Sequence, residues 1–453
     1  MYLSRIEIEN IRGFGSGDLK VDLDLSRPDG SHAGWTVLAG RNGSGKSTLL
    51  RSIALAVAAP SQLALQPSLV GWLRAGTDLG FVDATIVAAP ELDELLVQKG
   101  RGSDRFNLSF NLYQLDAGPE PEFTFSSQVA LVFRKSDEAG RPLVFERVGP
   151  WAPNPQGWFM AGYGPYRRLT GSFEGQRVTN GPPYLNRLAS LFREDASLVE
   201  SIQWLKEHHL RRLEKKPGAE ELVENVLTLL NDGLLPDSTR VSKIDSDGLW
   251  VTQGKRDFPL NDMSDGYRTT AALVLDLARQ LQLTYQEFKL VQQNGTWCVP
   301  YPGVVLIDEV ELHLHVSWQR RIGFWLKRHF PNIQFIVTTH SPFVCQAADP
   351  KGLIRLPAPG EERTAEHVSD DLFRTVVNGT VDEAVLTELF GLEHVHSEAS
   401  EKLRTRVAEL EVRLMDGKAT EEERAEFERL SAQLPDTGSA LVDRAVRSLG
   451  LDK

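Results

Sequence analysis

Three things are scarce in this sequence of 453 residues: cysteine, long apolar runs and an excess of positive charge. The two cysteines, Cys298 and Cys345, stand alone, which argues against a disulfide framework or a cysteine-based metal site and fits a reducing compartment. No apolar run approaches the roughly 18 residues that span a bilayer. The opening, MYLSRIEIENIRGF, carries charges where a signal peptide needs an apolar stretch. We therefore expect a cytoplasmic protein that does not enter a membrane.

The charge balance narrows the function classes further. The chain has 50 Lys and Arg against 62 Asp and Glu, a net charge of −12. This argues against a generally basic protein that coats DNA, although a local basic groove stays open. Hydrophobic residues at 41% and charged residues at 25% are typical of a globular chain. The length predicts two or three subdomains.

Long heptad repeats are absent as well, which excludes long coiled-coil arms. Near the C-terminus an apolar stripe runs for less than two heptads: Leu403, Val407, Leu410 and Leu414. The sequence DGK interrupts it, and Thr420 with Glu423 predicts a capping box that starts a second helix ending near Leu434. We expect a short antiparallel helical hairpin there.

The stretch LAGRNGSGKSTLL has the spacing of a phosphate-binding loop, G-x4-G-K-S. Glycines let the backbone N–H groups point at phosphate oxygens, and the following helix adds the positive end of its dipole. In such a loop Lys46 reaches the β- and γ-phosphates and the Ser47 hydroxyl ligates Mg²⁺. The apolar WTVLA before it and the helical STLLRSIALAVAA after it favour this over a glycine-rich turn that matches by chance. The candidate nucleotide-binding residues are Gly40, Asn42, Gly43, Ser44, Gly45, Lys46, Ser47 and Thr48.

A second phosphate-site element is GVVLIDEVELHLH, residues 303–315. Its apolar run is typical of a buried parallel strand, and it ends in two carboxylates. We predict that Asp308 ligates Mg²⁺ and that Glu309 is the general base for the attacking water. The alternative is a core strand that ends in a solvated acidic turn. A transition-metal cluster with His313 and His315 is a weaker interpretation, because no third nitrogen or sulfur ligand lies at a recognisable spacing.

The stretch NIQFIVTTHSP repeats this arrangement, because an apolar strand again ends in polar residues. Carboxyl ends of neighbouring parallel strands meet at one edge of a sheet. We therefore predict that His340 contacts the γ-phosphate or the attacking water. A capped or otherwise satisfied histidine is the alternative.

In PLNDMSDGYRTTAALVLDLARQL, residues 259–281, a small turn precedes a strongly helical run. The turn consists of Ser264, Asp265 and Gly266. Such a turn at a helix N-terminus is an anion site, although taken alone it is only a helix cap. Its place in the chain, between the phosphate-binding loop and the Asp-Glu pair, gives it more weight.

The intervening segments have simpler patterns. Residues 105–150 alternate and predict antiparallel strands, residues 185–230 predict two or three helices, and RVSKIDSDGLWVTQGKRDFPL predicts a β-hairpin. The helix in WLKEHHLRRLEKK has a basic face. Such a face contacts nucleic acid or a protein partner, or, more commonly, is simply solvated. This face consists of Lys206, Arg211, Arg212, Lys215 and Lys216.

The order of these motifs resembles the ATP-binding cassette ATPases, and among them the branch of chromosome-maintenance heads, RecF and OLD-type ATPases. The opening IEIENIRGFG is similar to the first strand and turn of that family, with Arg12 and Phe14 in matching places. The resemblance implies an α/β P-loop NTPase head, with a parallel core sheet, an antiparallel β-lobe, a helical insertion and the C-terminal hairpin. The candidates for its glutamine-loop residue are Gln156 and Tyr163, and neither is a convincing match.

The resemblance also implies ATP and Mg²⁺ as cofactors, and two heads that hold ATP between them as a homodimer or a higher homo-oligomer. In it Ser264, Asp265 and Gly266 contact the γ-phosphate bound to the other subunit. The corresponding division of the chain is 1–104 for the first half of the head, 105–260 for the β-lobe and helical insertion, 261–360 for the second half of the head, and 361–453 for the C-terminal helical region.

The stretches DEVELHLHVSWQRR and TTHSPF resemble most closely the ATPases of bacterial anti-phage systems, of the Septu and retron PtuA type and AriA of PARIS, although Val316 stands where a proline is common. This resemblance implies an ATPase that controls a separate effector, a nuclease or a toxin. We expect no nuclease site in this chain, since the acids after His340 do not end apolar strands. A RecF-like DNA-repair ATPase that binds nucleic acid is the alternative, and the nucleotide-binding subunit of a transporter is a third, less favoured one.

Overall fold

The computed structural model describes residues 1–58, 65–66, 68–94, 104–114, 123–124, 129–137, 149–151, 155–165, 183–193, 198–235 and 239–435. The chain forms two compact units, Met1–Phe390 and Gly391–Lys453. The fourfold division made from the sequence stays a prediction.

A mostly parallel sheet forms the centre of the first unit, in the order β17-β16-β3-β15-β14-β8. All neighbouring strands are parallel except the edge pair of β16 and β17. The apolar runs of the central strands are buried on both faces, as expected when layers cover both sides of a parallel sheet. The strands are β3 (Gly34–Ala39), β8 (Met160–Tyr163), β14 (Gly303–Ile307), β15 (Ile333–Thr339), β16 (Leu353–Arg355) and β17 (Glu366–His367).

Successive side chains of these strands enter two separate hydrophobic cores. In β14, Val305 and Ile307 pack into the first core, while Val304 and Leu306 pack into the second. This follows from the two-residue period of a strand. The first core is completed by helices α3 (Val199–Leu213), α4 (Ala219–Asn231), α5 (Asp265–Tyr285) and α7 (Ile322–His329).

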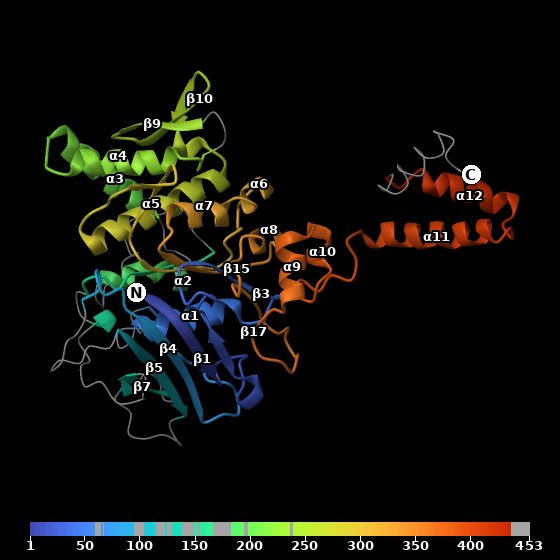
Figure 1. Cartoon of the computed structure of the whole chain (residues 1–453), viewed down its shortest axis with the longest axis horizontal. Helices are drawn as coiled ribbons and strands as arrows, with labels where there is room; N and C mark the ends of the chain where they lie inside the picture. The colour runs from blue at the N-terminus through green and yellow to red at the C-terminus, as the bar shows by residue number, and fades with distance from the viewer. Residues whose placement is uncertain are drawn as a thin grey trace. The chain divides into compact units, whose positions relative to one another are not determined.

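The second core lies between the parallel sheet, helix α1 (Lys46–Ala58) and an antiparallel sheet. Figure 1 shows α3, α4 and α5 on one side of the parallel sheet, which is labelled at β3 and β15, and β1, β4 and β5 on its other side. The antiparallel order is β2-β1-β4-β5-β7-β6. Its strands are β1 (Tyr2–Glu9), β2 (Val21–Asp24), β4 (Leu79–Val87), β5 (Arg105–Gln114), β6 (Phe123–Thr124) and β7 (Val129–Asp137).

The antiparallel pairing of β5 and β7 confirms the strands predicted after residue 105. The stretch PLVFERV, residues 142–148 of the same predicted segment, lies outside the described residues. The helices predicted within 185–230 are present as α2 (Ala189–Phe192), α3 and α4. The α/β fold class predicted from the sequence is confirmed.

We call the turn of Ser264, Asp265 and Gly266 the signature turn. The segment before it is a three-stranded meander rather than a simple hairpin. It consists of β9 (Thr239–Asp245), β10 (Gly248–Gln253) and β11 (Arg256–Pro259). A separate hairpin of β12 (Val291–Gln293) and β13 (Thr296–Cys298) follows α5. The remaining helices of this unit are α6 (Val316–Gln319), α8 (Pro342–Cys345), α9 (Asp370–Asn378) and α10 (Val381–Val385), with short 3-10 turns at Gly17–Leu19, Gly149–Trp151, Pro183–Arg187 and Leu260–Asp262.

The second unit contains the predicted helical hairpin, formed by α11 (Glu398–Met415) and α12 (Glu421–Ser431). The Thr420 hydroxyl accepts a hydrogen bond from the Glu423 N–H at 3.2 Å, and the Glu423 carboxylate accepts one from the Thr420 N–H at 2.9 Å. This confirms the capping box. Arg406 bridges the two helices through Glu426 at 2.8 Å. The second helix ends at Ser431, three residues before the predicted end at Leu434.

Candidate functional site

The strand register places three predicted site segments at one edge of the parallel sheet. Ala39 at the end of β3 pairs with Thr339 at the end of β15, and Ile307 at the end of β14 pairs with Val337. The residues that follow these strand ends are Gly40, His340 and Asp308. The carboxyl edge of an open α/β sheet is where ligands bind in this class of fold.

The loop between β3 and α1 has the close packing that its glycines allow. Gly45 has a φ of +90°, and a Cβ there would lie 2.7 Å from the Phe14 ring. The Lys46 side chain is only 7% exposed, and its ammonium donates to the carbonyl oxygens of Gly40 at 2.7 Å and Arg41 at 2.9 Å. The Ser44 hydroxyl is buried and has no hydrogen-bond partner among the described residues. A buried free hydroxyl beside a lysine held at the loop fits a phosphate ligand.

Burial lowers the pKa of the Lys46 ammonium below its ordinary value. The negative charges of nearby carboxylates oppose that shift. These carboxylates belong to Asp308, Glu309 and Glu311. The structure thus brings the predicted phosphate-binding lysine and the predicted acidic residues into one electrostatic environment.

Asp308 is held by its neighbours on both sides. Its side chain is buried, and it accepts a hydrogen bond from the Thr338 hydroxyl at 2.6 Å. Its N–H donates to the carbonyl oxygen of Tyr163 at 2.8 Å, which ties the end of β14 to β8. The same Thr338 hydroxyl accepts a hydrogen bond from the Glu309 N–H at 2.8 Å. One hydroxyl can donate and accept at once, so Thr338 orients both acidic residues.

Glu309 has a left-handed backbone, with a φ of +46°. A residue with a Cβ pays roughly 1–2 kcal/mol for this conformation, which persists only where the surroundings enforce it. Here the Thr338 hydrogen bond to its N–H supplies part of that constraint. The turn carries Glu309 away from the regular strand path at the sheet edge.

His340 is exposed at the end of β15, and its backbone N–H donates to the Glu311 carboxylate. Partial desolvation of the ring, and next the positive charge of Lys46, lower the pKa of the His340 imidazole. The ring is therefore neutral at pH 7 and is able to accept a hydrogen bond. Because the folded pKa lies below the unfolded one, this group favours the folded state above the unfolded pKa, and that contribution is lost as the pH falls.

The signature turn has different surroundings. Ser264 is the N-cap residue of α5 and is exposed, and its side chain makes no capping hydrogen bond. Asp265 forms an ion pair with Arg268 one turn along the helix. A Cβ on Gly266 would lie 2.6 Å from the carbonyl oxygen of His313, so glycine is required for this close approach. The turn therefore packs on the segment that follows the acidic pair, and no described contact joins it to the phosphate-binding loop.

Two residues of this edge were missed by the sequence analysis as site residues. Thr338 bridges Asp308 and Glu309, and Glu311 holds the main chain of His340. The sequence places Thr338 one residue before the end of β15, which is a weak sign of a site residue. Its contact with Asp308 and Glu309 follows only once the register between β14 and β15 is known. Glu311 carries a weaker signal, since an acid three residues after Asp308 is also typical of a solvated turn.

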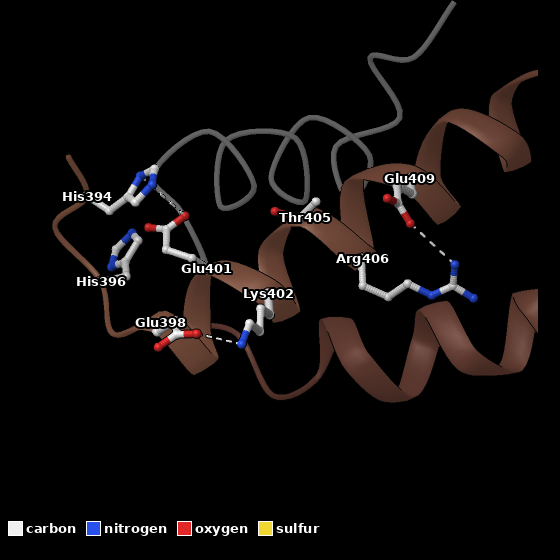
Figure 2. Close-up of a pocket in the computed structure, with 8 residues that line it drawn as sticks. All are labelled: His394, His396, Glu398, Glu401, Lys402, Thr405, Arg406 and Glu409. Atoms are coloured by element: carbon white, nitrogen blue, oxygen red, sulfur yellow. Dashed lines mark hydrogen bonds and ion pairs between the residues drawn. The ribbon is translucent and has the colours of Figure 1, made fainter.

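The second unit has its own pocket, of about 570 Å³, along the start of α11. Figure 2 shows its lining, in which Lys402 pairs with Glu398 at 2.6 Å and Arg406 pairs with Glu409 at 3.4 Å. Arg406 also pairs with Glu426 of α12, so both of these basic side chains already have acidic partners within the second unit. The lining of this pocket contains neither a glycine loop nor a buried carboxylate like those at the sheet edge, so the sheet edge of the first unit is the candidate phosphate site.

Together, the fold and this site have the arrangement of a P-loop head of the α/β class. Two family models match the chain: one described as "AAA domain, putative AbiEii toxin, Type IV TA system" over residues 185–346, and one described as "AAA domain" over residues 5–72. Both motif-bearing parts of the head are thus matched.

Among curated proteins, the chain is 45% identical over 91 residues to "Retron Ec83 probable ATPase" of Escherichia coli, which covers 20% of this chain and 16% of that protein. It is 26% identical over 343 residues to "Septu protein PtuA" of Bacillus mycoides (strain KBAB4), which covers 75% of this chain and 38% of the relative. The matches thus span well under half the length of these relatives. The resemblance to PtuA-type and retron ATPases inferred from the motifs is confirmed.

Among solved structures, the chain is similar to "Crystal structure of the SmcHead bound to the C-winged helix domain of ScpA", with a TM-score of 0.47 and 15% identity. The match covers 81% of this chain and 98% of that one.

Among the described residues, no helix is both long and apolar enough to cross a membrane. The cytoplasmic location expected from the sequence stays a prediction.

Proposed function

We propose that this protein binds and hydrolyses ATP, dimerises around the bound nucleotide and controls a separate effector, a nuclease or a toxin, in anti-phage defence. One observation carries the ATPase part of the proposal. The buried Lys46 of the phosphate-binding loop shares one sheet edge with the buried Asp308 and with Glu309. A lysine for phosphate, a carboxylate for a divalent cation and a second carboxylate for water are the parts that phosphoryl transfer to water requires.

The residues divide the work between binding and chemistry. The N–H groups of the loop and the Lys46 ammonium would bind the phosphates, and the Ser44 hydroxyl would gain the partner that it lacks. Ser47 and Asp308 would hold Mg²⁺, which when bound neutralises negative charge on the β- and γ-phosphates. Glu309 would take a proton from the attacking water. The neutral imidazole of His340 would accept a hydrogen bond from that water or orient the γ-phosphate.

The dimer part of the proposal is supported by the signature turn. Ser264 is exposed at the positive end of α5, a helix of 21 residues, and its hydroxyl makes no capping hydrogen bond. This is a suitable donor for a phosphate bound to a second copy of the chain. Two copies would then enclose two nucleotides, and each site would combine the strand ends of one copy with Ser264 of the other.

The role in anti-phage defence is inferred from the similarity to the Septu and retron ATPases. After His340, the four acids Asp370, Asp371, Asp382 and Glu383 lie in the first turns of helices α9 and α10 rather than at the ends of apolar strands. We therefore assign the nuclease or toxin activity to a separate effector, and the ATPase controls when that effector is active.

A pull-down of tagged Glu309→Gln protein from its native host tests the proposal, with and without Mg-ATP and with the mass of each complex measured. Glu309→Gln is expected to accumulate the ATP-bound dimer because the base for hydrolysis is lost. Capture or release of a nuclease-like or toxin-like protein on addition of ATP supports the control of a separate effector. Co-purified DNA without a stable protein partner contradicts it, and a membrane protein partner favours the transporter interpretation.

A second candidate function is a RecF-like ATPase that binds DNA directly. The observation that favours it is a basic stretch at the end of α3 and directly after it, where Arg211, Lys215 and Lys216 are exposed. If DNA binds there, ATP turnover rises with DNA and that stimulation falls steeply with salt. The triple substitution to alanine then removes the stimulation and leaves basal turnover unchanged.

A further inference from the structure

Glu311 has one carboxylate oxygen in use and one that is not. Its Oε1 accepts the backbone N–H of His340. Its Oε2 is buried and has no hydrogen-bond partner among the described residues. A buried carboxylate oxygen without a donor is destabilising, so an arrangement of this kind calls for an explanation.

The place of this oxygen suggests what it binds. Glu311 lies three residues after Asp308, and its charge acts on both Lys46 and His340. The carboxylate therefore faces the same sheet edge as the phosphate-binding loop. The Lys46 ammonium already donates to two loop carbonyls. None of the described protein groups donates a hydrogen bond to Oε2, so a bound ligand is the source of the donor that this oxygen calls for.

We propose that Glu311 is a further residue of the nucleotide site, whose Oε2 accepts a hydrogen bond from a water of the nucleotide complex. The inference rests on the proposed ATPase function. An ionised carboxylate is an acceptor only, so it repels phosphate oxygens and binds water, which donates. That water is either a ligand of Mg²⁺, which keeps several waters when bound to phosphates, or the water that attacks the γ-phosphate.

The Glu311→Gln substitution separates this role from a purely structural one. Glutamine keeps the shape and retains a carbonyl oxygen for the His340 N–H, but it replaces the second oxygen by an NH₂ donor. If Glu311 only holds His340, the variant behaves like the wild type. If Oε2 binds a water, the variant puts a donor where an acceptor is needed.

The experiment compares the wild type, Glu311→Gln and the matched control Glu362→Gln, whose glutamate is exposed. Binding of a fluorescent ATP analogue is titrated at a series of Mg²⁺ concentrations, and ATP turnover is measured on the same samples. For a Mg²⁺-bound water we expect the half-saturating Mg²⁺ concentration for nucleotide binding to rise about tenfold. For the attacking water we expect unchanged binding and a turnover reduced about tenfold or more.

Either result supports the proposal and identifies the water. Wild-type values for both quantities in Glu311→Gln overturn it. Glu311→Asp, which keeps the charge but withdraws the oxygens by one methylene, provides a second variant if Glu311→Gln has a lowered melting temperature, and it is expected to lose less than Glu311→Gln. Failure of the wild type itself to bind Mg-ATP is a different result, because it contradicts the proposed function rather than the role of Glu311.

Discussion

The two halves of the proposed nucleotide site are built in opposite ways. At the sheet edge, the Lys46 ammonium donates hydrogen bonds to loop carbonyls. Asp308 is held by Thr338 and Tyr163, and the Glu309 N–H is held by Thr338. At the signature turn, Ser264 is exposed and its side chain makes no capping hydrogen bond. The first half is preorganised within one chain, whereas the second half presents a donor that awaits an acceptor. This contrast favours a site that is completed by a second molecule.

The contrast also predicts which property each substitution changes. A change at the strand ends acts inside one chain, so it alters chemistry or nucleotide affinity. A change at the signature turn leaves nucleotide affinity intact and alters association. The experiments below test this separation, in the order of the expected effect.

Glu309→Gln is expected to have the largest effect. Loss of a general base typically lowers turnover by about 100- to 10,000-fold, while ATP affinity is retained because the phosphate ligands are untouched. Steady-state turnover and nucleotide titration of the same preparation measure the two quantities. Glu362→Gln, on the exposed surface, is the control. Normal turnover in Glu309→Gln means that another group is the base.

Lys46→Ala is expected to weaken ATP binding by about 100-fold, because a charged hydrogen bond of up to about 3 kcal/mol is lost at the phosphates. Equilibrium binding of a fluorescent ATP analogue measures this change. Lys255→Ala, at an exposed turn, provides the matched control. Retained affinity in Lys46→Ala rules out the assignment of the phosphate-binding loop.

Ser264→Arg tests the other half. A long side chain in a closely packed contact costs about 1–3 kcal/mol, so ATP-dependent dimerisation is expected to weaken roughly ten- to hundredfold. Nucleotide affinity of the monomer is expected to stay unchanged. Analytical ultracentrifugation with and without Mg-ATP, in a Glu309→Gln background, gives the association constant. An unaltered ATP-dependent mass contradicts the model in which Ser264 completes a site on the second copy.

Thr338→Val is expected to have the smallest effect. It removes the hydroxyl that joins Asp308 to the Glu309 N–H, and the loss of about 1 kcal/mol or slightly more corresponds to roughly five- to tenfold lower turnover. Thr338→Ser keeps the hydroxyl and is expected to retain most of the activity. Equal rates for the valine and serine variants show that the bridge does not orient the acidic pair.

The parts of the fold that the sequence predicted are those governed by local patterns. The glycine loop between an apolar strand and a helix, the fully apolar run of β14 and the capping box of Thr420 each involve residues that are close in sequence. In these segments the type of element and its start are determined by neighbouring residues. The meeting of Lys46 and Asp308 at one sheet edge depends in addition on the register of β3, β15 and β14.

The missed features depend on contacts between distant segments. The bridging role of Thr338 exists only because β14 and β15 pair with Ile307 opposite Val337. The place of Glu311 depends on its contact with the main chain of His340, which lies 29 residues further along the chain, so no local pattern signals it. The meander before α5 was predicted as a two-stranded hairpin, because β11 is short and its burial is partial.

The close approach of Gly266 to the carbonyl of His313 has a consequence for the timing of the two sites in a dimer. The segment that follows Glu309 in one site supports the turn that would serve the other site. In the proposed dimer, a displacement of this segment would therefore reach the opposite nucleotide, and by thermodynamic reciprocity binding at the opposite site would act back on it. We expect that occupation of one site changes the ATP affinity of the other.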